Sequence, residues 1–272
     1  MESSRHVVLI HGTWCNGESW ADARAEFEKR GFTVHTPTQR HHELPLLAGA
    51  SLIAGLSLTD YVDDLVTLTE SLESPPLVVG LSMGGLLAQL VAARTEHVGV
   101  IAAAPAPAAG LFNMYPSMVR LFYGHFLQLR PWRKPIYPTW ERFRWGAAAM
   151  QSEEHARRMF ETLVTDSGRA YCEMAFPWLD RAKAARVDFS AITTPVLALS
   201  GDRDRIVAPR VARATAAKYA RGTFISIPGA DHMLFDGDAL PTTMKVIDDW
   251  LAGVQWSVRG RQLSMPGPTA ES

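Results

Sequence analysis

Cysteine is nearly absent from this sequence, which has two among its 272 residues, Cys15 and Cys172. Two cysteines so far apart exclude a disulfide scaffold and a zinc site of the usual paired spacing. Long apolar runs are also missing, since none approaches the ~18 residues that a membrane-spanning helix needs. The N-terminus lacks the apolar region of a signal peptide. We therefore expect a soluble, cytoplasmic protein with no membrane partner.

Excess charge of either sign is lacking as well. The 27 lysines and arginines nearly balance the 28 aspartates and glutamates, which gives a formal net charge of -1. This balance provides no basic field for a nucleic acid and no acidic tail. The sequence has no cluster of metal ligands and no phosphate-binding loop, so we expect neither a metal nor an organic cofactor. What is present is an ordinary globular composition, 47% hydrophobic and 20% charged.

Short apolar runs alternate with longer amphipathic stretches along most of the chain. The runs are continuous rather than alternating, as expected for parallel strands buried on both faces. Strand and helix in strict succession predict an α/β fold, a doubly wound and mostly parallel sheet with right-handed crossovers. The expected strands are 6–10, 32–36, 77–81, 98–103, 195–200 and 223–227, and the expected helices are 19–30, 58–72, 83–94, 207–219 and 240–251.

One region, residues 106–189, interrupts this order and is called the insertion below. It has no clear strand, and residues 112–178 hold 14 of the 25 aromatic residues, including four of the eight tryptophans. The rings could form the insertion's own core, line a ligand pocket, or do both, because ligand pockets are mostly apolar. We expect a helical cap here, a core built from residues 1–105 and 190–253, and a polar C-terminal tail at 254–272.

A serine stands at the junction of the third expected strand and the helix that follows. The sequence there is GLSMGG, with Ser82 between Gly80 and Gly84. In a G-x-S-x-G turn between a buried strand and a helix, the glycines let the backbone bend sharply and lift the serine clear of its neighbours. The helix N-terminus beside the serine favours a developing negative charge. This context predicts that Ser82 is a nucleophile.

A serine hydroxyl needs a base, and the base needs an acid to orient it. His232 follows the last expected strand, and Asp202 and Asp204 follow the strand before it. All should emerge at the carboxyl edge of the sheet, where open α/β sheets place their chemistry. Serine, aspartate, histidine is also the chain order of a triad on such a sheet. For the other candidate histidines we expect no catalytic role. His41 and His42 should be solvated in a polar loop, and His97, His125 and His155 should lie near helices, either on the surface or with their hydrogen bonds satisfied.

With these motifs in place, the sequence resembles the α/β-hydrolase fold superfamily, in its serine-esterase-like branch with a helical cap. The resemblance covers nearly all of residues 6–252 and rests on HGTW at 11–14, GLSMGG at 80–85, GDRDRIVAP at 201–209 and GADHM at 229–233. In similar proteins a small apolar pair and a proline follow the acid, so the resemblance implies Asp204 as the acid rather than Asp202.

The resemblance also assigns roles to the HGTW motif. It implies that the backbone N–H groups of Thr13 and Met83 form the oxyanion hole, and that His11 braces the loop instead of acting as a second base. Trp14 is then expected on the acyl side of the pocket, or in plain loop packing. We add Trp140, Trp145 and Trp178 of the insertion as candidate pocket residues.

A serine at position 82 excludes the branches that use aspartate there, the haloalkane dehalogenases and epoxide hydrolases. Acyl transfer to water is then the default, and we expect a carboxylesterase acting on small to medium hydrophobic esters. The alternatives are a lactonase, a perhydrolase, a non-catalytic ligand-binding protein, and a carbon–carbon bond hydrolase or lyase for an anionic ring substrate. A homodimer is possible but undecided. The carbon–carbon bond hydrolase or lyase would use basic residues of the insertion as a clamp for the substrate carboxylate: Arg120, Arg130, Arg133, Lys134, Arg142 and Arg144.

Overall fold

The computed structural model describes residues 5–112, 115–253, 256–258 and 261–263. Six parallel strands form the central sheet, in the order β2-β1-β3-β4-β7-β8. Each of the six expected runs contributes one strand, which confirms the doubly wound, mostly parallel fold. The strands are β1 (Arg5–Ile10), β2 (Phe32–His35), β3 (Leu77–Leu81), β4 (Gly99–Ala103), β7 (Val196–Gly201) and β8 (Gly222–Ile227).

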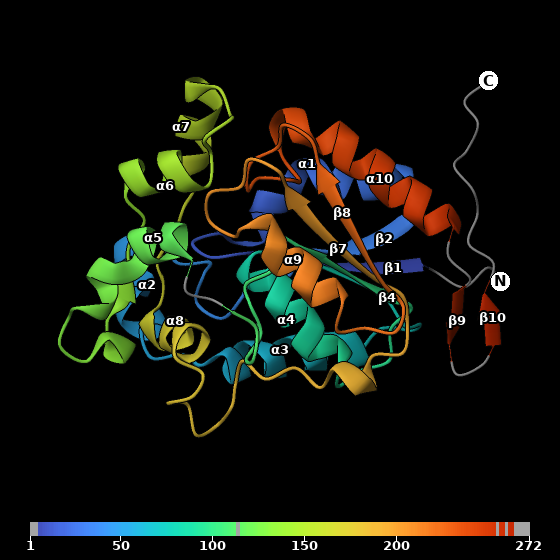
Figure 1. The fold of residues 1–272 in the computed structure, drawn as a ribbon, viewed down its shortest axis with the longest axis horizontal. Helices are drawn as coiled ribbons and strands as arrows, with labels where there is room; N and C mark the ends of the chain where they lie inside the picture. Colours follow the sequence, from blue (N-terminus) through green and yellow to red (C-terminus); the bar gives the residue numbers. More distant parts are fainter. Residues whose placement is uncertain (1–4, 113–114, 254–255, 259–260, 264–272) are drawn as a thin grey trace.

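Helices cover both faces of this sheet. Figure 1 shows α1 (Ala21–Lys29) and α10 (Leu240–Gly253) on one face, and α3 (Leu58–Glu70), α4 (Met83–Ala92) and α9 (Pro209–Ala216) on the other. Because both faces are covered, every residue of β3, β4 and β7 is buried, which is why these strands read as continuous apolar runs.

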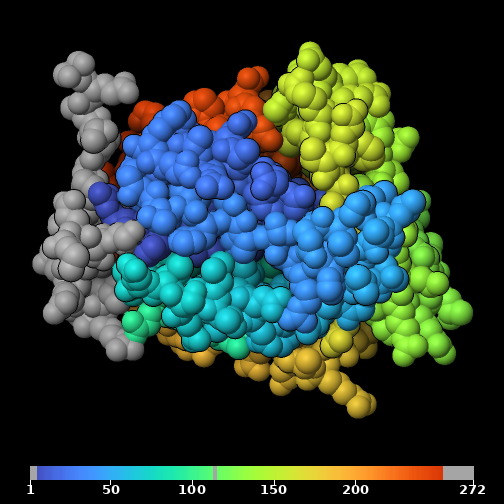
Figure 2. All heavy atoms as spheres, turned by 180° about the vertical axis from the view of Figure 1, so that it is seen from behind, coloured from blue at the N-terminus to red at the C-terminus, as the bar shows by residue number. Residues whose placement is uncertain are grey.

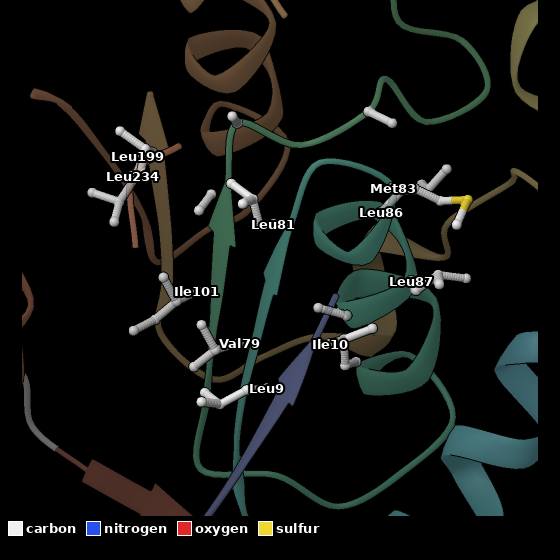
Figure 3. Packing of buried hydrophobic residues seen from close by; sticks show 14 of the residues in the cluster. Leu9, Ile10, Val79, Leu81, Met83, Leu86, Leu87, Ile101, Leu199 and Leu234 are labelled. Atoms are coloured by element: carbon white, nitrogen blue, oxygen red, sulfur yellow. The ribbon is translucent and has the colours of Figure 1, made fainter. Parts of the chain in front are cut away.

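The core lies between the sheet and these helices. Figure 3 shows aliphatic side chains of β1, β3, β4 and β7 together with those of α4. Every residue of α4 is buried, so the helix that begins beside Ser82 is held on all sides. Each buried side chain of this size contributes about 1.5–3 kcal/mol relative to exposure. The core therefore fixes the end of β3 and the start of α4 rigidly.

The insertion between β4 and β7 is mainly helical. Its helices lie together at one end of the molecule (Figure 1), and Figure 2 shows the same end from behind, in green and yellow. The expectation that the insertion has no strand is wrong in detail. Pro135 and Ile136 pair with Ser167 and Asp166 in a short antiparallel ladder. The elements are α5 (Pro116–Phe126), η2 (Pro131–Arg133), β5 (Pro135–Ile136), α6 (Trp140–Gly146), α7 (Glu153–Glu161), β6 (Asp166–Ser167) and α8 (Gly168–Ala175). A short helix, η3 (Phe189–Ala191), leads from the insertion into β7.

Five further elements lie outside the pattern read from the sequence. They are η1 (Gly17–Trp20), α2 (Leu46–Ile53), η4 (Gly237–Ala239) and an antiparallel pair, β9 (Trp256–Val258) with β10 (Arg261–Leu263). The rest of the predicted tail at 254–272 lies outside the described residues. Within the described ranges, no single helix is long and apolar enough to cross a membrane; only α2 and α3 together pass that test, and they are bent by 102°.

Candidate active site

Ser82 occupies a strained turn between the last residue of β3 and the first residue of α4. Its φ of 60° and ψ of -122° are rare for a residue with a side chain. The flanking glycines are required by space, because a Cβ on Gly80 would overlap the Gly84 carbonyl and one on Gly84 would overlap the backbone of β1. The Ser82 N–H donates to the Ala103 carbonyl at 2.9 Å, which fastens the turn to β4. The turn is the one that the GLSMGG motif predicts.

The loops after β7 and β8 bring an acid and a base together. The His232 ring Nδ1 lies 2.7 Å from Asp204 Oδ2, and both side chains are almost fully buried. The other oxygen of Asp204 accepts the N–H groups of Ile206 and Val207, at 2.7 and 2.9 Å. Asp202 is exposed and instead accepts the Gly229 N–H, at 2.8 Å. Asp204, and not Asp202, is therefore the partner of His232.

Ser82 and this pair meet at the same edge of the sheet. Leu81, which precedes Ser82, and Met233, which follows His232, line the same small pocket. Ile206, whose N–H bonds Asp204, lines a second, larger cavity together with Ser82. With Nδ1 directed at Asp204, the ring leaves Nε2 for a reacting group. In the described part of the chain no hydrogen bond joins the Ser82 hydroxyl to His232, so proton transfer between them belongs to the proposal below.

The loop after β1 lies directly against the serine. A Cβ on Gly12 would come within 3.0 Å of Ser82 Cβ, so the two turns touch. Thr13 and Met83 line the cavity beside Ser82. Among the described residues neither of their backbone N–H groups has an acceptor, whereas the Thr13 hydroxyl accepts a hydrogen bond from Tyr171 at 2.6 Å. Two unpaired N–H groups beside a nucleophile are suited to an oxyanion.

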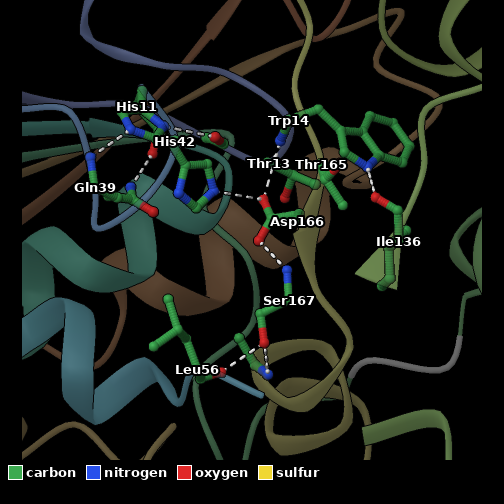
Figure 4. A network of polar contacts seen from close by, with 12 residues as sticks. His11, Thr13, Trp14, Gln39, His42, Leu56, Ile136, Thr165, Asp166 and Ser167 are labelled. Atoms are coloured by element: carbon green, nitrogen blue, oxygen red, sulfur yellow. Dashed lines mark hydrogen bonds and ion pairs between the residues drawn. The ribbon is translucent and has the colours of Figure 1, made fainter. Parts of the chain in front are cut away.

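His11 braces this loop, as the sequence suggests. Its Nε2 accepts the Gln39 N–H at 3.0 Å, so its proton resides on Nδ1, which donates to the Gly12 carbonyl at 2.9 Å (Figure 4). Both bonds require a neutral ring. Burial, aided by the nearby His42, lowers the pKa of His11 to about 3. A ring that stays neutral and has both nitrogens engaged is structural.

The expectation that His42 is solvated is wrong. Its side chain is fully buried, with Nδ1 3.2 Å from the Arg40 carbonyl and Nε2 3.7 Å from Asp166 Oδ2. Burial alone would lower the pKa of His42, but the nearby Asp166 carboxylate and the hydrogen bond to the Arg40 carbonyl outweigh burial and raise the pKa above the ordinary value. Asp166 belongs to the insertion, 124 positions away, so no local pattern could reveal this pair.

The remaining candidate histidines lie away from the serine. His97 is buried and bonds the Thr95 carbonyl at 2.9 Å, while His155 pairs with Asp236 at 2.7 Å. His125 is buried on α5, and burial lowers its pKa. None of the three lines the cavity beside Ser82.

That cavity has a volume of about 240 Å³ and opens over Ser82. Its floor comes from the loops of the core, and its walls come from α5 and the segment at the end of α8. The wall residues on α5 recur at helical spacing, so a periodicity search within the insertion could have found them. The main apolar wall residues are Met118, Val119, Phe122, Phe126, Met174 and Phe176.

Trp14 is not one of the lining residues, so its expected place in the acyl pocket is corrected. It lies one layer behind the wall, with its ring centroid 6.1 Å from that of Phe122 and only 4% of its surface exposed. Its indole N–H donates to the Ile136 carbonyl at 3.0 Å. A buried indole needs such a partner, and the insertion supplies it.

The three tryptophans of the insertion do not line the cavity either. Trp140 lies under the Arg157 guanidinium, 4.0 Å from the ring centroid, and Trp145 lies under Arg120 at 4.4 Å. Trp178 is 67% exposed. These tryptophans thus serve cation–π pairs and the packing of the insertion, whereas phenylalanines of the insertion line the cavity. The prediction of tryptophan pocket residues is wrong.

The basic residues of the insertion also avoid the cavity. Arg120 covers Trp145, and the Arg144 guanidinium bonds the Ala148 carbonyl. Among the residues that the structure describes, no charged side chain lines the cavity, so the arginine clamp considered for an anionic substrate does not form there. Within the described ranges, no three histidine, cysteine, aspartate or glutamate side chains come close enough to hold a metal ion.

Comparison with known proteins places this geometry in a family. A search of the curated proteins found no match in sequence. Among solved structures, the fold is similar to a thermophilic esterase from Thermogutta terrifontis (19% identity, 92% of this chain and 90% of that one, TM-score 0.66). It is also similar to a monoacylglycerol lipase from Paleococcus ferrophilus (20%, 91% and 95%, TM-score 0.62) and to the pyrethroid hydrolase PytH (17%, 93% and 100%, TM-score 0.60). At these identities the likeness shows the fold alone.

The model of the alpha/beta hydrolase family matches residues 7–241. This span contains the Ser82 turn, the Asp204–His232 pair and the whole insertion. The chain belongs to the alpha/beta hydrolase family.

Proposed function

We propose that this hydrolase cleaves carboxylic esters through an acyl-enzyme on Ser82, with His232 as base and Asp204 as the orienting acid. The observation that carries the proposal is the Asp204–His232 hydrogen bond of 2.7 Å at the sheet edge where the strained turn presents Ser82. Asp204 fixes the ring so that Nδ1 keeps its proton and Nε2 faces the reaction.

The chemistry proceeds in two halves. His232 Nε2 takes the Ser82 proton as Oγ attacks the ester carbonyl carbon, and the tetrahedral oxyanion binds to the N–H groups of Thr13 and Met83. The intermediate collapses, the C–O bond to the alcohol breaks, and the imidazolium returns its proton to the departing oxygen. Water then repeats the sequence on the acyl-enzyme and releases the acid. Catalytic hydrogen bonds often tighten only when substrate binds, which fits the open Ser82–His232 contact here.

The cavity indicates the substrate class. A volume of about 240 Å³ and an apolar wall suit a small to medium ester with a hydrophobic acyl or alcohol part. Burying a carboxylate there without a cationic partner would be costly. This argues against an anionic ring substrate, and with it against the carbon–carbon bond hydrolase or lyase.

The test is hydrolysis of p-nitrophenyl esters of graded acyl length and branching, with aliphatic lactones alongside. The wild type should hydrolyse short and medium esters, Ser82→Ala should lose this activity, and Ser200→Ala should keep it. Ser200 is a matched control, since it is a buried serine near the end of β7, which is separated from β3 in the sheet by β4 alone. No hydrolysis of any ester by folded wild type would refute the proposal, and preference for lactones would reassign the substrate class.

A further inference from the structure

Trp14, which follows the expected oxyanion donor Thr13, has a left-handed backbone conformation with φ of 64°. Residues with a Cβ rarely adopt this conformation, because the side chain crowds the backbone. Such an outlier persists only when its surroundings hold it in place. The contacts of Trp14 therefore determine the shape of the loop that carries Thr13.

The insertion engages every polar group of Trp14. The backbone N–H donates to Asp166 Oδ2 at 3.0 Å, the carbonyl accepts the Val164 N–H at 2.7 Å, and the indole N–H donates to the Ile136 carbonyl at 3.0 Å. Figure 4 shows the Asp166 carboxylate and the Ile136 carbonyl on either side of Trp14. The bond to Ile136 holds the ring, and the bond from Val164 holds the Trp14 carbonyl. The bond to Asp166 is the one made by the N–H of the Thr13–Trp14 peptide, so it is the one that orients this peptide.

Asp166 is built for this contact. It is fully buried, its second oxygen accepts the Ser167 N–H at 2.6 Å, and the His42 ring lies 3.7 Å from the first. A carboxylate accepts a hydrogen bond more strongly than a neutral group does. The nearby Asp166 carboxylate in turn raises the pKa of the His42 ring against the effect of burial. The acceptor for Trp14 is thus a carboxylate fixed in a closed site.

We propose that Asp166 is a positioning residue for the oxyanion loop: by holding the Trp14 N–H, it keeps Trp14 left-handed and directs the Thr13 N–H at the reacting carbonyl. The inference rests on the proposed ester hydrolysis and adds a role for the insertion, which then contributes to transition-state binding as well as to the cavity wall. Asp166 does not line the cavity, so its effect reaches the substrate only through the loop.

The direct test is Asp166→Ala. Alanine removes both acceptor oxygens, so the Trp14 N–H loses its partner, whereas an asparagine could turn its amide oxygen toward Trp14 and keep that bond. Complete loss of an oxyanion donor costs about 10²–10³ in rate. A misdirected donor should therefore lower kcat by roughly 10- to 100-fold. The KM should stay within about twofold, since the cavity wall is untouched, and a trifluoromethyl ketone analogue should lose affinity in parallel with kcat.

Glu173→Ala is the matched control. Glu173 is also a buried carboxylate of the insertion, and it bonds the core through the Ser57 hydroxyl and the Leu58 N–H, each at 2.8 Å, away from the oxyanion loop. It should lose thermal stability while keeping kcat and analogue affinity. Equal kcat and equal analogue affinity in the two folded variants would overturn the proposal.

A second variant covers the case in which Asp166→Ala does not fold. A backbone ester at position 14, introduced through the α-hydroxy acid of tryptophan, removes only the N–H that Asp166 accepts and retains every side chain. It should show the same loss of kcat with unchanged KM, and wild-type kcat in this variant would overturn the proposal. If the wild type hydrolysed no ester, the proposed function would fail before either variant was compared.

Discussion

Acidification should destabilise the protein through His11, and the size of the effect follows from its two hydrogen bonds. The ring accepts the Gln39 N–H and donates to the Gly12 carbonyl, so a second proton would oppose the Gln39 N–H. Because the pKa is about 3 in the folded chain against 6.5 for an ordinary histidine, the unfolded chain binds a proton that the folded chain does not. Stability from this group is therefore present above pH 6.5 and is lost as pH falls from 6.5 toward 3.

Between about pH 8 and about pH 5 the loss amounts to roughly 2 kcal/mol. At pH ~5 this figure depends on the ordinary pKa far more than on the folded one, because the folded ring is still neutral there. His11→Gln offers an amide oxygen to the Gln39 N–H and cannot titrate, so it provides the reference. Histidines elsewhere contribute equally to both proteins and cancel in the comparison.

Urea unfolding at the two pH values measures the effect. The free energy of unfolding should fall by roughly 2 kcal/mol more in the wild type than in His11→Gln. An equal fall in both proteins would refute the reasoning, since it would mean that His11 takes up its proton as readily in the folded chain as in the unfolded one.

Three further predictions concern the site. Asp204→Asn should lower kcat/KM by about 10⁴ because the base loses its orienting acceptor, whereas the kcat/KM of Asp202→Asn should stay within a few-fold of the wild type. Steady-state kinetics on one ester distinguish the two variants, and the reverse ranking would move the acid to Asp202. Phe126→Ala should shift preference across the ester panel toward longer acyl chains by enlarging the cavity, while the exposed Trp178→Ala should leave the profile unchanged; the same profile in both would contradict the assigned wall. Gly84→Ala should abolish soluble folded protein, because its Cβ overlaps the backbone of β1; circular dichroism showing a wild-type melting temperature would contradict the packing.

The features that the sequence predicted well are those that local pattern determines. The strand before Ser82, the two glycines and the apolar helix after it all lie between Leu77 and Ala92, and the turn needs all of them at fixed spacing. The Asp204–His232 pairing was also predictable, because parallel strands deliver their following loops to one edge. Helix α2 was not expected, since its mostly apolar residues follow Pro45 without a side-chain cap to mark a helix start.

The features that were missed depend on contacts between distant parts of the chain. His42 looks solvated in its own loop but is buried between the rings of His11 and Tyr61, with Asp166 of the insertion beside it. Trp14 was placed in the pocket by its position beside the oxyanion loop, but the insertion draws its ring behind Phe122. The aromatic density of the insertion suggested that its tryptophans line a pocket. The cavity is instead walled by one face of α5, which includes Phe126. Neither composition nor motif carries that information.

Covalent labelling tests the central claim, that Ser82 is the nucleophile activated by His232 and Asp204, most directly. The protein is treated with a fluorophosphonate, and the intact mass and the modified peptide are determined for the wild type, Ser82→Ala and Asp204→Asn. The account predicts one adduct per chain on Ser82 of the wild type, no adduct in Ser82→Ala, and much slower labelling of Asp204→Asn. An adduct on another residue, or rapid ester hydrolysis by a wild type that takes up no label at Ser82, would contradict it.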